Sequence, residues 1–189
     1  MTRSHIRAWL PFGLVLLGAA TFLAYGSARG SDPKPRLSPR VETGLSSGFV
    51  VKVLDGDTLT LADNRAIRLV QIDAPELDES ECYAEEARAA LEKLTPIGTQ
   101  VAPRLDPSLD IRDPNGRVLA YVLREGQNVN LRLVVLGAAA PYFHRGERGR
   151  YASELLAAAR EARAAKRGLW GACPGTPLEP GRQVDTGPQ

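Results

Sequence analysis

The sequence predicts a five-stranded β-barrel that carries about three α-helices. Two observations favour this class. Five short segments rich in β-branched and aliphatic residues alternate with turn-forming residues, and three of them precede the first helical segment while two follow it. The other helical segments come after the last strand. This order is expected for a partly open Greek-key barrel of the OB type with additional C-terminal helices.

The expected strands are bounded by residues that favour turns. They span residues 49–54, 58–61, 67–72, 99–105 and 118–123. Asp55 and Gly56 separate the first two strands, and Asp63 and Asn64 separate the next two, so the first three form a meander. Pro103 lacks a backbone N–H, and it therefore restricts its strand to an edge or a bulge.

The expected helices have recognisable ends. They span residues 80–94, 129–136 and 151–166. The first has acidic residues at its front and Lys93 at its end, which suits the helix dipole, and Pro96 and Gly98 terminate it. Gly137 is a natural C-cap for the second helix, and Gly168 ends the Ala-rich third.

The chain is expected to have one folded domain, at residues 48–173, with tails on both sides. Arg3 and Arg7 precede an uncharged, mostly apolar run and then small residues, so residues 1–28 are predicted to be a signal peptide or an N-terminal membrane anchor. Both alternatives place the domain outside the cytoplasm. Residues 29–47 have the composition of a flexible linker. Residues 174–189 are rich in Pro and Gly and are predicted to be disordered.

The two cysteines, Cys82 and Cys173, are expected to form one disulfide, because an even pair in an exported chain usually does. Two separate buried thiols are the less favoured alternative. A redox enzyme is disfavoured because the C-x-x-C spacing is absent.

The charge distribution indicates a local site. Six of the 24 basic residues and only two of the 22 acidic residues precede residue 43, which leaves 18 basic and 20 acidic residues in the remainder. A protein that binds nucleic acid mainly through counterion release usually has a strongly basic face. Phosphate chemistry in this domain would therefore depend on a few side chains gathered at one site.

Two pairs of residues could form that local site. Asp57 follows a turn and Asp73 ends a strand, and each is unremarkable alone. If the barrel brings them together, their carboxylates and a backbone carbonyl suit Ca²⁺. Zinc is disfavoured, since His144 is the one histidine of the domain. Arg68 and Arg117 could each be solvent-exposed, but a guanidinium is also well shaped to hold a phosphate.

Five segments together resemble the staphylococcal nuclease family. They are VVKVLDGDTLTL, IRLVQIDAPE, RDPNGRVLAYV, VNLRLVVLGAA and RGLWG, and in this order they cover about residues 48–171. The resemblance implies a Ca²⁺-dependent endonuclease of DNA and RNA that breaks the 5′ P–O bond and leaves 3′-phosphate ends.

The resemblance also implies a role for each matching residue. Asp57 and Asp73 would bind the metal through their carboxylates, Ala74 would bind it through its backbone carbonyl, and Asp55 would be an outer carboxylate. Glu76 would be the general base toward water, and Arg68 and Arg117 would hold the scissile phosphate.

Substrate contacts are expected from the segment before the last helix. Where the family's best-known member has two tyrosines that stack on the base, this chain has Phe143 and Arg145. Tyr142, Phe143 and Arg145 are therefore the expected substrate-binding residues, and the protein is expected to act as a monomer. Two alternatives are a non-catalytic OB-fold module that binds nucleic acid and a surface-anchoring domain. Neither explains the complete set of carboxylates and arginines.

Overall fold

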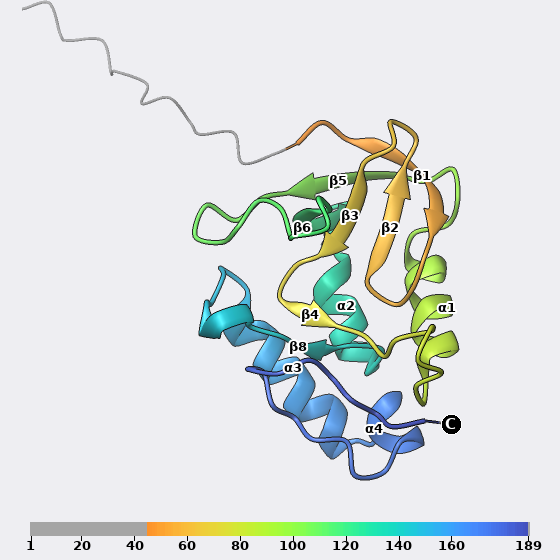
Figure 1. Cartoon of the computed structure of the whole chain (residues 1–189), viewed down its shortest axis with the longest axis vertical. Helices are drawn as coiled ribbons and strands as arrows, with labels where there is room; N and C mark the ends of the chain where they lie inside the picture. Colours follow the sequence, from red (N-terminus) through yellow and green to blue (C-terminus); the bar gives the residue numbers. More distant parts are fainter. Residues whose placement is uncertain (1–44, 189) are drawn as a thin grey trace, which may run out of the picture. The chain divides into compact units, whose positions relative to one another are not determined.

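A computed structural model of the protein describes residues 45–188, and the folded part is a barrel with helices below it (Figure 1). The elements of the barrel are β1 (Gly48–Val53), β2 (Thr58–Leu61), β3 (Ala66–Leu69), β5 (Gln100–Arg104), β6 (Val118–Arg124) and the short β7 (Gln127–Asn128). The strand order is β3-β2-β1-β5-β6-β7, and β3 also pairs with β6 in parallel. That last pairing closes five strands into a barrel, so the predicted fold class is confirmed.

Helix α2 (Val129–Leu136) lies below the barrel in Figure 1 and helps to close its core. Its buried residues Leu133 and Val134 belong to the same apolar cluster as the inward-facing residues of the strands. Asn128 caps the helix, because its side chain accepts a hydrogen bond from the backbone N–H of Leu131. Gly137 ends it with φ of 71°, as the sequence predicts.

The third strand is shorter than predicted. It ends at Leu69 because Gln71 adopts a left-handed conformation, with φ of 65°, and turns the chain out of the barrel. Gln71 is held there by two hydrogen bonds, from its Nε2 to Glu147 O (2.9 Å) and from Gly149 N to its Oε1 (2.7 Å). The next residues form β4 (Ile72–Asp73), which pairs with β8 (Ala140–Pro141) outside the barrel.

Four further helical elements complete the described part of the fold. They are α1 (Ala84–Leu94), the 3₁₀ turn η1 (His144–Gly146), α3 (Ala152–Ala164) and α4 (Leu169–Ala172). Helix α1 begins four residues later than predicted, because Tyr83 has φ of 72° and cannot continue a right-handed helix. Within the part of the chain that is described, no helix has the length and apolar character needed to cross a bilayer.

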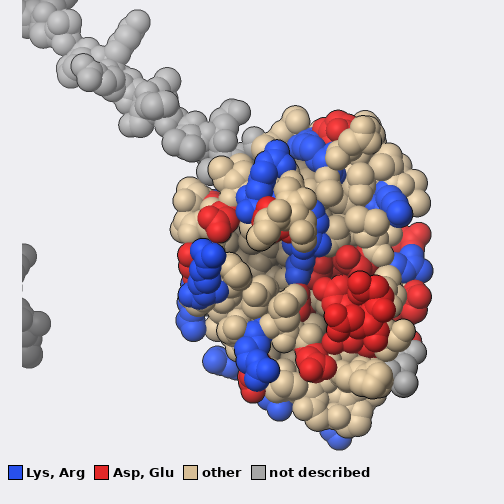
Figure 2. Space-filling model, viewed as in Figure 1, with Lys and Arg blue, Asp and Glu red and all other residues tan. Residues whose placement is uncertain are grey.

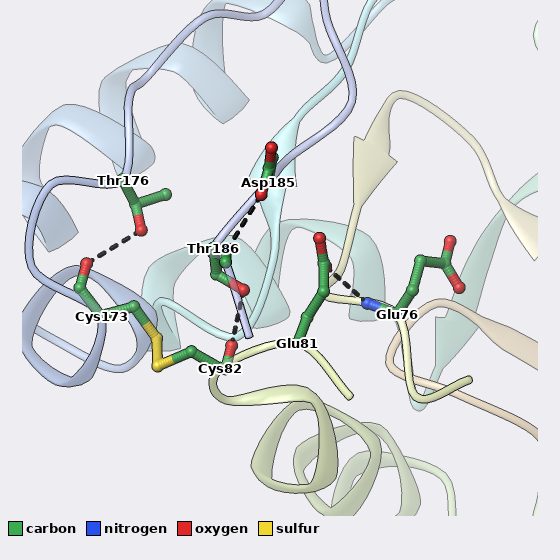
Figure 3. The surroundings of a disulfide bond; sticks show 8 residues. Glu76, Glu81, Cys82, Cys173, Thr176, Asp185 and Thr186 are labelled. Atoms are coloured by element: carbon green, nitrogen blue, oxygen red, sulfur yellow. Dashed lines mark hydrogen bonds between the residues drawn. A yellow bond between two sulfur atoms is a disulfide. The ribbon is translucent and has the colours of Figure 1, made fainter. Parts of the chain in front are cut away.

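The predicted disulfide between Cys82 and Cys173 is present. It joins the start of α1 to the end of α4 across 91 positions of sequence (Figure 3). Closing so long a loop restricts the unfolded chain, and removing a native disulfide of this kind typically costs about 2–5 kcal/mol.

The prediction that residues 174–189 are disordered is wrong for the described residues, 174–188. Val184 is buried beside Trp170 and Cys173, and the backbone of this segment bonds to other parts of the fold. Its Pro and Gly content reflects an extended path over the surface, and the free energy that orders it comes from these long-range contacts. The predicted leader and most of the predicted linker lie outside the described residues.

Candidate active site

The turn after β1 places Asp57 at the end of the barrel beside β4. The backbone N–H of Asp57 donates to Asp55 Oδ1 (2.9 Å), which closes the turn on itself. Asp57 Oδ2 then accepts a hydrogen bond from Ala74 N (2.9 Å), so the turn is fastened to the residue that follows β4. Two segments that are 17 positions apart therefore meet at one point.

Gly56 makes this close approach possible. A Cβ atom at this position would lie 2.5 Å from Ala74 Cβ and 2.8 Å from Ala87 Cβ. Gly56→Ala is therefore expected to destabilise the fold by about 1–3 kcal/mol, the usual cost of overpacking, and to move Asp57 away from Ala74. Chemical denaturation would measure the loss. Gly181→Ala is the matched control, because a Cβ there meets nothing within 4 Å, and equal stability of the two variants would contradict the prediction.

Arg68 is buried between the two aspartates. Its Nη1 lies 2.8 Å from Asp57 Oδ2, and its Nη2 lies 2.5 Å from Asp73 Oδ1. Nη1 also donates to the carbonyl oxygens of Leu69 (3.0 Å) and Ile72 (2.8 Å). The alternative that Arg68 faces solvent is thus excluded. The guanidinium is fixed in one orientation by carboxylates on one side and backbone on the other.

Burial disfavours the ionised form of both aspartates even with Arg68 between them. The pKa of Asp57 is raised well above its ordinary value, mainly by burial, with the charge of Arg68 opposing and those of Asp55 and Asp73 adding. The pKa of Asp73 is also raised by burial, against the opposing charge of Arg68. Carboxylates in this state would be stabilised by a further cation.

Arg117 joins the same cluster through Thr58. Its Nη1 donates to Thr58 Oγ1 (3.3 Å), and Thr58 Oγ1 in turn donates to Asp57 Oδ1 (3.0 Å). The Nε of Arg117 donates to Asp113 Oδ2 (2.6 Å), and burial of Asp113 is outweighed by its bonds to Arg117, so the pKa of Asp113 is lowered. The side chain of Arg117 is 31 % exposed, whereas that of Arg68 is 10 % exposed. Arg117 is therefore the arginine that solvent and a ligand reach more easily.

Glu76 lies on the acidic side of the site. Burial is the largest cause that raises its pKa to about 7, and the charges of Asp55 and Asp73 add to it while Arg68 opposes. Its backbone N–H donates to Glu81 Oε2 (2.8 Å), a contact drawn in Figure 3. Figure 2 shows acidic side chains gathered into one patch, with basic side chains beside it.

A cavity of about 500 Å³ opens next to the arginines. Its lining includes Arg68, Arg117, Tyr142, Arg145 and Gln183. Of the three residues expected to contact substrate, Tyr142 and Arg145 therefore face this cavity.

The prediction for Phe143 is wrong. Its side chain is 3 % exposed, and the guanidinium of Arg148 covers its ring at 5.5 Å from the centroid. A base could not stack on it in this arrangement. Tyr142 is half-buried, and its hydroxyl contacts His144 Nδ1 (3.1 Å).

The residues present fit a hard cation. Asp57 and Asp73 converge closely enough to share one guanidinium, and both provide oxygen, the donor that Ca²⁺ prefers. Within residues 45–188, no three side chains of His, Cys, Asp or Glu gather as a ready-made metal site. A cation here would therefore depend on these two carboxylates together with a backbone carbonyl, such as that of Ala74, and water.

Three contributors to the site were not assigned roles from the sequence. Thr58 is adjacent to Asp57, and Asp113 stands four positions before Arg117 across an Asn-Gly turn, so both could have been suspected from position. The backbone N–H of Val184 donates to Asp73 Oδ2 (2.7 Å). No sequence signal marks that contact, because the two residues are 111 positions apart.

Comparison with known proteins is consistent with this geometry. The family model described as "Staphylococcal nuclease homologue" matches residues 66–172. A protein of Escherichia coli named "Uncharacterized endonuclease" is 38% identical over 127 residues, which cover 65% of this chain and 76% of that protein. The thermonuclease of Staphylococcus intermedius is 26% identical over 161 residues, or 83% and 94% of the two chains. Endonuclease YhcR of Bacillus subtilis is 32% identical over 151 residues, 71% of this chain and 12% of that protein.

Proposed function

Since the chain belongs to the staphylococcal nuclease family and is accordingly a nuclease, we propose that it cuts DNA or RNA at internal phosphodiester bonds in a reaction that depends on Ca²⁺. One observation carries the proposal. Arg68 is held against both Asp57 and Asp73, while Arg117 is connected to Asp57 through Thr58. Groups that bind cations and groups that bind phosphate thus occupy the same place.

The arginines stabilise the transition state. As water adds to phosphorus, negative charge grows on the phosphoryl oxygens, and guanidinium donors already in position lower its energy. Arg68 cannot swing away, because carboxylates and carbonyls hold it. Arg117 is anchored by Asp113 but remains partly exposed toward the cavity. Their fixed positions reduce the reorganisation that the reaction requires.

Glu76 is the group assigned to the water molecule. As a general base it takes one proton when the water oxygen bonds to phosphorus, and the bond from phosphorus to the 5′ oxygen breaks. The departing oxygen takes a proton from solvent, which gives a 5′-hydroxyl and a 3′-phosphate. A calcium ion held by Asp57, Asp73 and Ala74 O would polarise the phosphate and add the positive charge that this near-neutral domain lacks.

A cleavage assay separates this function from simple binding. The domain would be incubated with single-stranded DNA labelled at its 5′ end and, in parallel, with labelled RNA, in the presence of Ca²⁺. The expected products are internal fragments that carry 3′-phosphate. Retention of the substrate in a gel shift without any cleavage would instead support the binding module.

Arg117→Ala is expected to lower kcat by about 10²–10³-fold, the usual loss for one oxyanion donor. The fold should survive, because the side chain is only part-buried and its ion pair is local. Single-turnover cleavage under saturating DNA measures the effect. Arg112→Ala is the control, since this exposed arginine lines the same cavity but its guanidinium bonds to Gly116 O. A parent-like kcat for Arg117→Ala would remove Arg117 from the reaction.

We also propose that the domain works outside the cytoplasm, as a monomer, and meets the membrane only through its N-terminal segment if that segment is retained. The Cys82–Cys173 disulfide supports export, because such bonds persist in oxidising compartments. Mass determination of the mature protein would distinguish a cleaved leader from a retained anchor.

A further inference from the structure

The C-terminal segment, residues 174–188, reaches the candidate active site. We call it the strap. The match to the family model ends at residue 172, just before the disulfide cysteine that precedes the strap. The strap nevertheless contacts Asp73, since Val184 N donates to Asp73 Oδ2 (2.7 Å), and the side chain of Gln183 lies close enough to the same carboxylate to lower its pKa. Gln183 also lines the cavity shared by Arg68 and Arg117.

The two oxygens of Asp73 are held from opposite sides. Oδ1 bonds to Arg68, a residue of the barrel, and Oδ2 bonds to Val184, a residue of the strap. A carboxylate bonded through only one oxygen can turn about its bond to Cβ, whereas this one is fixed at both ends. The hydrogen bond from the strap, together with that from Arg68, therefore fixes the direction in which the remaining lone pairs of Asp73 point.

The strap is attached at both ends to one disulfide. Its first residue follows Cys173, and near its other end Gly187 O accepts a hydrogen bond from Cys82 N (2.8 Å). Thr186 Oγ1 donates to Cys82 O (2.8 Å), as Figure 3 shows. Between these ends, Val184 is buried against Trp170 and Cys173.

A further contact fastens the middle of the strap, where the backbone N–H of Phe143 donates to Pro180 O (2.6 Å). The segment is thus bonded at its start, middle and end. A peptide held in this way can keep a backbone N–H in a constant position relative to β4.

From these contacts we propose that the strap is a positioning element of the active site, in which Val184 N and Gln183 orient Asp73 for cation binding. The inference rests on the proposed function, since it takes Asp73 as a ligand for Ca²⁺. Hydrogen bonds to a ligating carboxylate fix its orientation, and loss of such an outer partner typically weakens metal binding about 10-fold to 100-fold. The disulfide contributes indirectly, because it holds both ends of the strap.

The test uses two variants of the full chain and a calorimetric Ca²⁺ titration. Val184→Pro removes the N–H donor, and it is expected to weaken Ca²⁺ binding about 10-fold to 100-fold. Gln183→Ala removes an exposed polar side chain beside Asp73, and it is expected to weaken binding about 2-fold to 10-fold, no more than one ordinary hydrogen bond would. Arg182→Ala, an exposed neighbour, is the control and should bind like the parent.

A second measurement distinguishes a loss of Asp73 orientation from a general loss of folded structure. At saturating Ca²⁺, Val184→Pro should regain the parent's kcat for DNA cleavage, which a partly unfolded protein would not do. If Val184→Pro does not fold, Gln183→Ala decides. If the parent binds Ca²⁺ and folded variants bind it equally well, the role of the strap is refuted and the proposed function stands. If the parent neither binds Ca²⁺ nor cuts DNA, both are refuted.

Discussion

Removal of Ca²⁺ with excess EGTA is expected to reduce cleavage of single-stranded DNA to the level of a sample without protein. The reason is the state of Asp57 and Asp73, which are buried, adjacent and raised in pKa, mainly by burial, even though Arg68 lies between them. Without a cation, two carboxylates face the single guanidinium of Arg68, so the cluster has no net positive charge to attract a phosphate. Cleavage rates in matched buffers with Ca²⁺, with EGTA, and with Ca²⁺ restored measure the effect.

Two variants test whether the Ca²⁺ dependence of cleavage arises at Asp73. Asp73→Asn should raise the Ca²⁺ concentration needed for half-maximal cleavage, because one of the two carboxylates becomes neutral. Asp63→Asn changes an exposed carboxylate that pairs with Arg65, away from the site, and should leave that concentration unchanged. Cleavage that proceeds equally fast in EGTA would rule out the metal, and the arginines would then have to act alone.

The barrel could be predicted because each strand carries its own signal. β-Branched segments, Asp-Gly and Asp-Asn turns and the cap at Gly137 are local features, and local features are readable from sequence. The point where β3 leaves the barrel was not predictable in the same way. Gln71 has a positive φ although it is not a glycine, and the bonds that hold it come from residues 147 and 149.

The site residues, too, have environments that depend on contacts between segments far apart in the sequence. Considered alone, Arg68 is typical of an exposed residue in a strand. It is buried because Thr58 of β2 lies beside it and the turn at Asp57 lies next to β4. The sequence suggests that Asp57 and Asp73 could meet, but only the resemblance to a family assigns Arg68 to the same site. Phe143 resembled a stacking platform in the sequence, but the chain turns it inward beneath Arg148.

The strap shows that amino-acid composition alone does not predict whether a segment is ordered. A Pro- and Gly-rich segment lacks the apolar content that usually orders a chain, so disorder was a reasonable expectation. Composition does not reveal that Val184 packs into an apolar cluster, or that backbone groups of the strap bond to residues 37 to 111 positions away. The order of such a segment depends on the rest of the fold, and it becomes visible only in three dimensions.

Glu76→Gln is expected to lower kcat by about 10²–10⁴-fold, the usual contribution of a general base. Glutamine keeps the shape of the side chain but cannot accept a proton from water. The variant should fold, because the bond from the backbone N–H of residue 76 to Glu81 does not involve the substituted side chain. Single-turnover cleavage at saturating DNA and Ca²⁺ gives the loss in kcat.

The stability of this variant provides an independent check on the environment of Glu76. Its folded-state pKa is raised to about 7, by burial first and then by Asp55 and Asp73, so the ionised form opposes folding at any pH above its unfolded value. In EGTA at pH 8, Glu76→Gln should therefore melt at the same temperature as the parent or higher. Glu79→Gln, a change at an exposed acid, is the matched control and should retain the parent's kcat. Loss of kcat in both variants would assign the effect to the negative charge of the segment that carries both residues, whereas loss in Glu76→Gln alone identifies the base.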